Sequence, residues 1–152
     1  MTEQARPDIA VYIGRFQPFH NGHLALLRQA LTLAGQVIVV IGSAHQARTP
    51  RNPFTWQERA DIIRLALPEA DRARVHFLPT RDYYDEARWV QAVHTGVADL
   101  GKQLGRPAKP SIALIGHFKD ATSGYLGRFP GWTLHAVERT EVAGRPLLHH
   151  VL

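Results

Sequence analysis

Residues 11–23 read Val-Tyr-Ile-Gly-Arg-Phe-Gln-Pro-Phe-His-Asn-Gly-His, and this stretch predicts a strand, a short turn and the start of a helix. The apolar, β-branched run at residues 9–13 stops at Gly14, which is typical of a short buried strand. Beyond the turn, apolar side chains recur at helical spacing, at Leu24, Leu27, Leu31 and Ala34. The turn between strand and helix has a size that suits a phosphate group.

His20 and His23 lie at the predicted start of this helix, where backbone N–H groups point outward and the helix dipole favours an anion. Each imidazole can donate a hydrogen bond to a phosphate oxygen, and either can stabilise the charge that develops when phosphorus is attacked. A zinc site and two unrelated surface histidines are the alternatives. Zinc usually needs further Cys, His or carboxylate ligands, and the chain has no cysteine and no His-Glu-x-x-His pattern. The pair therefore favours a polyphosphate ligand, and we predict no metal site built from protein side chains.

The composition narrows the class of protein. A length of 152 residues suits one domain with a real core. The absence of cysteine excludes a disulfide framework, a thiolate metal site and a cysteine nucleophile. The first residues contain no apolar segment that could serve as a signal peptide, and the longest apolar run, at residues 37–41, is too short to span a membrane. We therefore expect a cytoplasmic protein with no membrane partner.

The charge of the chain points to anionic partners. Eighteen Lys and Arg residues against 13 Asp and Glu residues give a net charge of +5, which attracts nucleic acids, membrane surfaces and nucleotides alike. No block of five or more like charges occurs, so a polybasic tail is disfavoured. Because no sequence motif indicates nucleic-acid binding, we expect no nucleic acid as a partner. The sequence leaves open whether the protein forms a homo-oligomer.

Strands and helices alternate along the rest of the chain. Residues 37–41 form an apolar run without alternation, which indicates a strand buried on both faces of a parallel sheet. Thr55 and Glu58 form a capping box at the start of a second helix, which Pro68 ends. Further strands are expected at residues 75–79, 111–116 and 133–138, and further helices at residues 85–104 and 123–129. This order predicts an α/β fold with a Rossmann-like, doubly wound, mostly parallel five-stranded sheet and flanking helices.

Charged and aromatic residues follow the ends of predicted strands, where open parallel sheets bind ligands. Arg51 lies on the loop after the second strand, and Lys119 follows the fourth. Lys119 could pair with a phosphate, and either residue could instead be a solvated side chain. Trp89 lies on the apolar stripe of the helix expected at residues 85–104, so its ring is either part of the core or a platform for a ligand.

Residues 14–23 resemble the signature of the nucleotidyltransferase superfamily, which contains a proline followed by His-x-Gly-His. The form Gly-Arg-Phe-Gln-Pro-Phe-His is similar to the nicotinamide mononucleotide adenylyltransferases of archaeal type. It most resembles the adenylyltransferase domain of bifunctional bacterial proteins that carry a Nudix hydrolase domain behind it. Residues 42–44 (Gly-Ser-Ala), 52–55 (Asn-Pro-Phe-Thr) and 116–120 (Gly-His-Phe-Lys-Asp) extend the resemblance along the chain.

The resemblance implies three groups of site residues. The catalytic group consists of His20, His23 and Arg15. The residues that bind ATP and its phosphates are Gly14, Phe16, Gln17, Gly22, Arg51 and Lys119. The residues that bind the nicotinamide nucleotide are Ser43, Asp82 and Trp89, with the tryptophan ring stacked on the nicotinamide.

The implied reaction joins nicotinamide mononucleotide to the adenylyl group of ATP, so that NAD forms and pyrophosphate leaves. The mononucleotide phosphate would attack the α-phosphorus in line, which needs positioning and charge stabilisation and no protein nucleophile. Mg²⁺ is the implied cofactor, bridging phosphate oxygens of ATP. The same fold could serve another acceptor, such as phosphopantetheine, FMN or an alcohol phosphate, or it could be a non-catalytic nucleotide-binding module.

The chain departs from the family in one respect. The family carries a second signature, Ser-x-Thr-x-x-Arg, whose helix N-terminus and arginine hold the ATP phosphates, and residues 140–145 have neither its serine nor its spacing. We therefore expect residues 1–152 to be a single nucleotidyltransferase domain without that segment. The loss of such a clamp would weaken stabilisation of the transition state.

Overall fold

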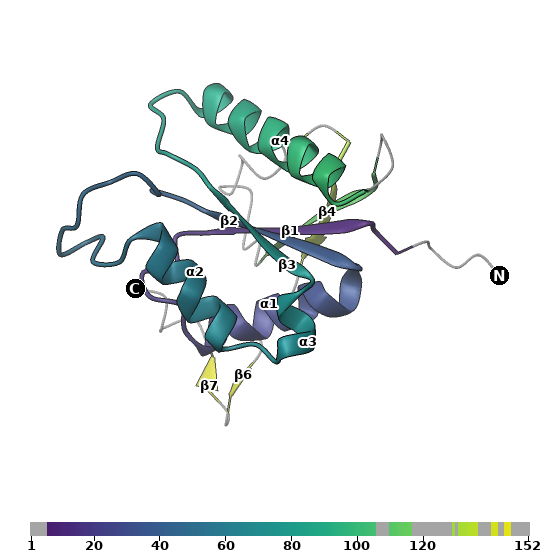
Figure 1. The fold of residues 1–152 in the computed structure, drawn as a ribbon, viewed down its shortest axis with the longest axis horizontal. Coiled ribbons are helices and arrows are strands. Elements are labelled where there is room, and N and C mark those ends of the chain that lie inside the picture. Colours follow the sequence, from purple (N-terminus) through teal and green to yellow (C-terminus); the bar gives the residue numbers. More distant parts are fainter. Residues whose placement is uncertain are drawn as a thin grey trace.

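The computed structural model of the protein describes residues 6–105, 110–116, 129, 131–136, 141–142 and 145–146. Its centre is a sheet of five strands in the order β3-β2-β1-β4-β5 (Figure 1). The strands are β1 (Ile9–Gly14), β2 (Gln36–Ile41), β3 (Val75–Pro79), β4 (Ile112–Gly116) and β5 (Thr133–Ala136). Every neighbouring pair runs parallel, so the predicted Rossmann-like α/β fold is confirmed, and the sheet is entirely rather than mostly parallel.

Helices cover both faces of this sheet. On one face lie α1 (Asn21–Leu33), α2 (Trp56–Leu65) and α3 (Glu69–Arg72), and on the other lies α4 (Glu86–Gln103) (Figure 1). The predicted helices that correspond to α1, α2 and α4 are confirmed to within a few residues at each end. None of the helices in the described part of the chain has the length and apolar character needed to cross a membrane.

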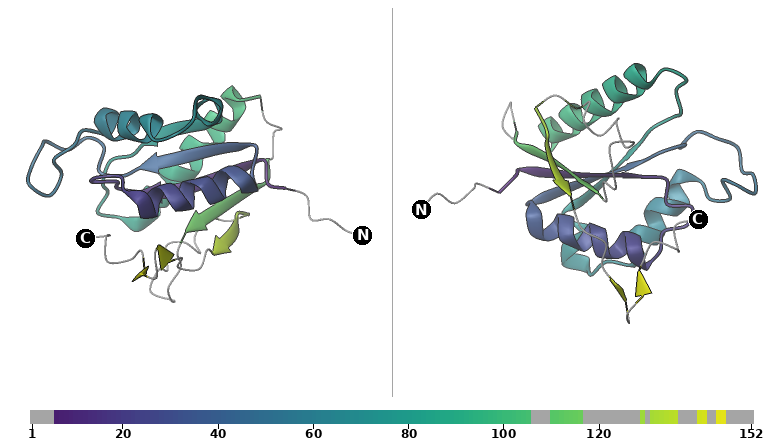
Figure 2. Two further views of the ribbon diagram at one scale, coloured as in Figure 1. Left: turned by 90° about the horizontal axis from the view of Figure 1, so that it is seen from below. Right: turned by 180° about the vertical axis from the view of Figure 1, so that it is seen from behind.

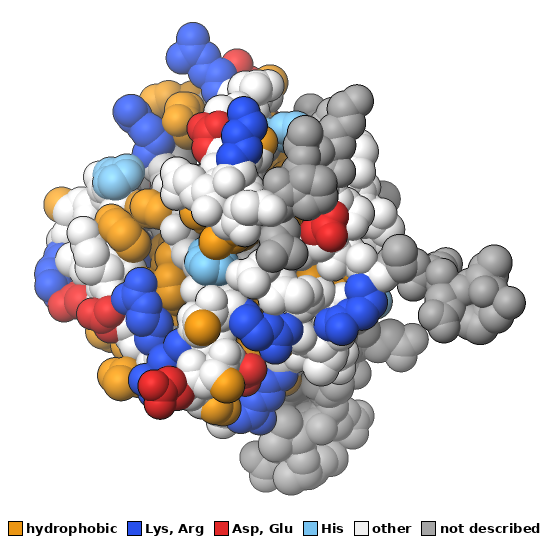
Figure 3. Space-filling model, turned by 45° about the vertical axis from the view of Figure 1, so that its right-hand side comes forward, with side chains coloured by type: hydrophobic (Ala, Val, Ile, Leu, Met, Phe, Trp, Pro, Cys, Tyr) orange, Lys and Arg blue, Asp and Glu red, His pale blue; other side chains and the backbone are white. Residues whose placement is uncertain are grey.

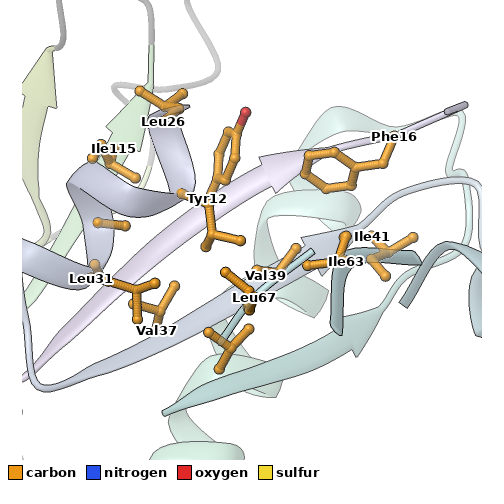
Figure 4. Packing of buried hydrophobic residues seen from close by; sticks show 14 of the residues in the cluster. Tyr12, Phe16, Leu26, Leu31, Val37, Val39, Ile41, Ile63, Leu67 and Ile115 are labelled. Carbon is orange, nitrogen blue, oxygen red and sulfur yellow. The ribbon is translucent and has the colours of Figure 1, made fainter. Parts of the chain in front are cut away.

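Successive residues of β1 point to opposite faces of the sheet, and both faces are buried. Ala10 and Tyr12 belong to the core cluster between the sheet and helices α1 and α2, part of which Figure 4 shows. Ile9 and Val11 belong to a second cluster, which includes residues of α4. Because neither face of the central strands meets water, their sequence is continuously apolar.

Three elements were not predicted, one helix and two strands. The helix α3 has four residues and follows Pro68, and it is too short to show an apolar repeat. A separate antiparallel pair is formed by β6 (Glu141–Val142) and β7 (Arg145–Pro146). The helix predicted at residues 123–129 lies outside the described residues except for Phe129, and so does the end of the fifth predicted strand.

The parallel arrangement brings the loops after β1, β2 and β3 to one edge of the sheet. Gly14 at the end of β1 is paired with Ile41 at the end of β2, which in turn is paired with Pro79 at the end of β3. In both views of Figure 2 the loop between β2 and α2 projects from this edge. Residues that are far apart in the sequence therefore meet there.

The turn after β1 depends on a close contact between Phe16 and Gly14. Phe16 has a φ of 55°, in the left-handed region that side chains other than glycine rarely adopt. This backbone conformation folds the ring back into the core, where it is 2% exposed and meets Tyr12 edge to face at 5.3 Å between ring centroids. A Cβ on Gly14 would lie 2.6 Å from the Cζ of Phe16. The glycine is required because the phenylalanine ring occupies the place of its side chain.

Replacing Gly14 by alanine is expected to lower the free energy of unfolding by about 1–3 kcal/mol, the usual cost of forcing an extra carbon into a packed interior. Gly35→Ala is the matched control, because no heavy atom lies within 4 Å of a Cβ added there. The control should change stability by no more than about 0.5 kcal/mol. Urea unfolding of both variants measures the difference, and equal stabilities would contradict the packing of Phe16 on Gly14.

Candidate active site

His20 and His23 form a reciprocal cap at the start of α1. His20 is the N-cap residue, and its Nδ1 accepts a hydrogen bond from the N–H of Gly22 at 3.1 Å. The N–H of His20 in turn donates to Nδ1 of His23, also at 3.1 Å. This is the geometry of a capping box, with histidines in both positions where Ser or Thr and Glu are usual. The two rings stack with 3.8 Å between their centroids, so the cap fixes both imidazoles at the helix N-terminus.

The cap also determines which ring nitrogen carries the proton. Because Nδ1 accepts a backbone hydrogen bond in each ring, the neutral imidazoles keep their proton on Nε2. Burial, together with the nearby His20, lowers the pKa of His23 from 6.5 to about 3. The rings of Phe16 and Phe19 contribute to that burial, with centroids 4.9 and 5.6 Å from that of His23. His23 is therefore a neutral N–H donor at physiological pH.

Two clefts meet at the carboxyl edge of the sheet. The histidine pair borders a cleft of about 690 Å³, which is lined by Gly14, Arg15, Phe16, Gln17, Pro18, His20, His23, Pro50, Arg51 and Pro53. The adjoining cleft, of about 720 Å³, is lined by Arg15, Ser43, Gln46, Thr49, Pro50, Arg51, Asn52 and Asp82. Arg15 and Arg51 line both clefts, and both side chains are exposed. Two guanidinium groups thus lie where the clefts meet.

Ser43 and Asp82 lie together in the second cleft. Ser43 follows the end of β2 with a φ of 50°, and it is 6% exposed. Its Oγ lies 3.0 Å from each carboxylate oxygen of Asp82 and can donate to either. Gln46 donates to the same carboxylate at 2.6 Å. The serine hydroxyl therefore anchors an acceptor carboxylate that faces the cleft.

Trp89 lies partly in the core and partly on the surface of a cleft. Its ring packs against the core cluster beside α4 and meets Phe129 edge to face at 5.9 Å between centroids. The same residue lines a smaller cleft of about 290 Å³ together with Tyr83, Tyr84 and Glu86. The tryptophan is thus a partly buried residue with one side on an aromatic cleft.

The remaining predicted site residues differ in what their side chains do. The Gln17 amide donates to the carbonyl of Phe54 and accepts from its N–H, both at 3.0 Å, so it joins the loop after β1 to the loop after β2. The side chain of Phe16 lies in the core. Gly22 uses its N–H in the histidine cap. Lys119 lies outside the described residues.

Sequence reasoning assigned no role to Arg59, and the structure shows it at the base of the site. The side chain is 1% exposed, although it is charged. Its guanidinium donates to the carbonyls of Arg15 at 2.8 Å, Gly42 at 2.7 Å, and Ser43 and Thr55 at 3.2 Å each. Buried charges are tolerated only when they are fully hydrogen-bonded, and these carbonyls meet that need.

One sequence signal could have identified this arginine. Arg59 lies four residues before Ile63, on the face of α2 that packs into the core. A charged residue on such a face needs polar partners inside the protein. Burial and the positive charge of Arg15 lower the pKa of Arg59, which still remains a cation because arginine ionises so far above neutral pH.

The described residues contain no cluster of metal-binding side chains, and the face drawn in Figure 3 shows no concentrated basic patch. They contain no group of three or more His, Cys, Asp or Glu side chains that could hold a metal ion. On the face shown in Figure 3, Lys and Arg side chains are spread out, with acidic and apolar side chains between them.

A family model described as cytidylyltransferase-like matches residues 11–116, from within β1 to the end of β4. The chain belongs to this family. The match covers the histidine cap, the loops that line both clefts and the helix that carries Trp89.

Named relatives make the likeness more specific. A nicotinamide/nicotinic acid mononucleotide adenylyltransferase of Acinetobacter baylyi is 40% identical over 131 residues, which are 86% of this chain and 67% of the relative. A nicotinamide-nucleotide adenylyltransferase of Ignicoccus hospitalis is 40% identical over 90 residues, which are 58% of this chain and 53% of that protein. A crystal structure of the bifunctional NMN adenylyltransferase/ADP ribose pyrophosphatase of Francisella tularensis, complexed with AMP and a manganese ion, has a TM-score of 0.74 and 33% identity.

The match with the Francisella structure covers 91% of this chain but only 39% of that chain. The match with the Ignicoccus protein covers about half of that relative. Within these bounds, the predicted resemblance to nicotinamide-nucleotide adenylyltransferases is confirmed. The predicted class of enzyme agrees with the names of these relatives.

Arg59→Met is expected to lower the free energy of unfolding by more than about 3 kcal/mol, because it leaves several buried carbonyls without a donor. Arg59→Lys keeps the charge and part of the hydrogen bonding, so it should lose less. Arg74→Met is the matched control, since Arg74 also donates to three carbonyls, those of Leu31, Ala34 and Gly35, but is partly exposed. Chemical denaturation compares them, and an Arg59→Met loss no larger than that of the control would contradict the anchoring role.

The lowered pKa of His23 predicts a loss of stability in acid. Between pH 6.5 and 3 the unfolded chain binds a proton at His23 that the folded ring refuses, so stability falls as the pH falls through this range. The contribution amounts to about 2 kcal/mol between pH 7 and pH 5. His23→Asn keeps an acceptor for the cap but cannot titrate, and urea unfolding at several pH values should show a flatter profile for it. Parallel profiles would refute the neutral, buried state of His23.

Proposed function

We propose that the two clefts form the active site of an adenylyltransferase that joins nicotinamide mononucleotide and ATP to give NAD and pyrophosphate. The observation that carries the proposal is the junction of the clefts at Arg15 and Arg51, beside the His20 and His23 pair at the start of α1. Two substrates that react through their phosphates need two adjoining sites with positive charge between them. The names of the relatives support the same reaction.

ATP would bind in the cleft bordered by the histidines. The α1 N-terminus and the Nε2–H groups of His20 and His23 would donate to its phosphate oxygens, which favours charge developing on the α-phosphate. Arg15 and Arg51 would hold the phosphates of both substrates in line. An oxygen of the mononucleotide phosphate then forms a bond to the α-phosphorus as the bond to the bridging oxygen breaks, and pyrophosphate leaves with that electron pair. A phosphate is already an anionic nucleophile, so the step needs no protein base.

The nicotinamide nucleotide would bind in the second cleft and extend to the smaller aromatic cleft, because Asp82 lines the second cleft and its neighbour Tyr83 lines the aromatic one. Ser43 and Asp82 offer a hydroxyl and a carboxylate for hydrogen bonds, and Trp89 offers a ring for stacking on the nicotinamide. These roles distinguish nicotinamide mononucleotide from phosphopantetheine, which has no ring, and from an alcohol phosphate. The residues of the aromatic cleft therefore favour a ring-bearing acceptor.

Mg²⁺ is the proposed cofactor, and it would be held through the phosphate oxygens of ATP. The described residues supply cationic and neutral donors at the junction, where the ligand itself would bring the oxygens that Mg²⁺ prefers. When bound, the ion would neutralise phosphate charge. The Francisella structure contains manganese together with AMP, which agrees with the use of a divalent ion in that relative. Lys119 stays a predicted phosphate ligand.

The experiment is an assay of NAD formation from nicotinamide mononucleotide, ATP and Mg²⁺. It is run on this chain and on any longer natural form of the protein, because the family's Ser-x-Thr-x-x-Arg segment does not occur in the 152 residues. We expect turnover, faster in a form that has the segment, and a loss of about 100-fold or more for His23→Ala.

Nicotinic acid mononucleotide, FMN and phosphopantetheine are tested beside the expected acceptor. A product with FMN or phosphopantetheine alone would overturn the acceptor assignment. ATP binding without turnover in every form would replace the enzyme by a non-catalytic nucleotide-binding module. A near-normal rate for His23→Ala would contradict the role of the histidine pair.

A further inference from the structure

A chain of hydrogen-bonded side chains crosses the second cleft from the end of β1 to the end of β3. The guanidinium of Arg15 donates through Nη2 to Oδ1 of Asn52. Asn52 donates through Nδ2 to Oε1 of Gln46 at 3.4 Å, and Gln46 donates through Nε2 to Asp82 at 2.6 Å. All of these residues line the cleft, so the chain forms part of its wall.

The chemistry of the two ends determines the orientation of both amides. Arg15 can only donate, and the carboxylate of Asp82 can only accept. Asn52 must therefore turn its oxygen to Arg15, and Gln46 must turn its NH₂ group to Asp82. Reversing either amide would set two donors or two acceptors against each other. This row of hydrogen bonds thus holds the Arg15 side chain in one orientation.

The same row of hydrogen bonds holds the Arg15 side chain without neutralising its positive charge. The three ion pairs among the described residues involve Arg48, Arg64 and Arg74, and Arg15 takes part in none of them. Two neutral amides separate its guanidinium from the Asp82 carboxylate, although both charges line one cleft. Arg48 differs, because it forms an ion pair with Glu58 in which Nη2 lies 2.8 Å from Oε2. A neutral acceptor leaves the charge of Arg15 available for a phosphate, whereas a carboxylate would compete with it.

We propose that Asn52 is a positioning residue that orients Arg15 for substrate phosphates while preserving its positive charge, with Gln46 holding Asn52 in place. The inference rests on the proposed function, in which Arg15 contacts phosphates. It adds that the uncharged state of Asn52 is the property that matters. An aspartate at this position would have nearly the same shape, but its carboxylate would pair with Arg15 and neutralise the charge that a phosphate needs.

The test is Asn52→Asp, which changes the charge of the side chain but hardly its shape. Isothermal titration calorimetry with ATP and with inorganic pyrophosphate should show binding weakened about tenfold, and kcat/KM for NAD formation should fall by a similar factor. The melting temperature should change little, because the new carboxylate pairs with Arg15 but loses the hydrogen bond to Oε1 of Gln46. Asn52→Ala frees the guanidinium without neutralising it, so it should lose less than Asn52→Asp.

Gln57→Glu is the matched control, since it adds the same negative charge at an exposed position on α2. We expect its affinity for ATP to stay within about twofold of the wild type, as for exposed charges in general. The double variant Arg15→Ala/Asn52→Asp separates positioning from a general structural effect. If Asn52 acts through Arg15, the second change should add nothing to the loss caused by the first.

Each outcome decides between the two proposals. Unchanged ATP affinity in Asn52→Asp, or a loss that multiplies with that of Arg15→Ala, would overturn the role of Asn52. Unchanged ATP affinity in Arg15→Ala would do the same. If the wild-type chain binds ATP but no form of it makes NAD, the proposed reaction fails while the calorimetry still tests Asn52. Absence of ATP binding in the wild type would overturn both.

Discussion

The buried guanidinium of Arg59 is the contact on which the geometry of the site depends. Strands β1 and β2 end side by side, and the carbonyls of Arg15, Gly42 and Ser43 lie beyond the regular ladder of hydrogen bonds. One arginine supplies donors to all three and also to the first turn of α2 through Thr55. Unsatisfied carbonyls in a dry interior would cost more than most single contacts contribute. The loops that line the two clefts therefore start from a fixed base.

The site separates its neutral donors from its charges. Burial keeps His23 neutral, so the histidine pair can offer N–H groups without repelling the cations nearby. Positive charge is carried instead by exposed Arg15 and Arg51, where the clefts meet. Arg59 adds a further buried cation beneath them. A polyphosphate would then meet oriented neutral donors near one reacting centre and positive charge around it, an arrangement that suits in-line transfer of an adenylyl group.

Local rules predicted the elements that have strong local signals. The β1–α1 unit, the capping box at Thr55 and Glu58, and the fully buried β2 follow from the order of residues within a few turns, and the structure confirms them. The elements that were missed, α3 and the β6–β7 pair, are too short to carry a periodic pattern. Their conformation depends on neighbours that no short window of sequence contains.

The sequence by itself determined the fold class, the helix start at His20 and His23, and the family, because these depend on residue types at close spacing. Only the tertiary structure decided which distant residues the motif contacts. Arg59 contacts Arg15 across 44 positions, and Gln17 contacts Phe54 across 37. Such partners meet because β1 and β2 lie side by side with their ends aligned. The neutral state of His23 has the same origin, since it follows from burial, and burial is a property of the packed chain.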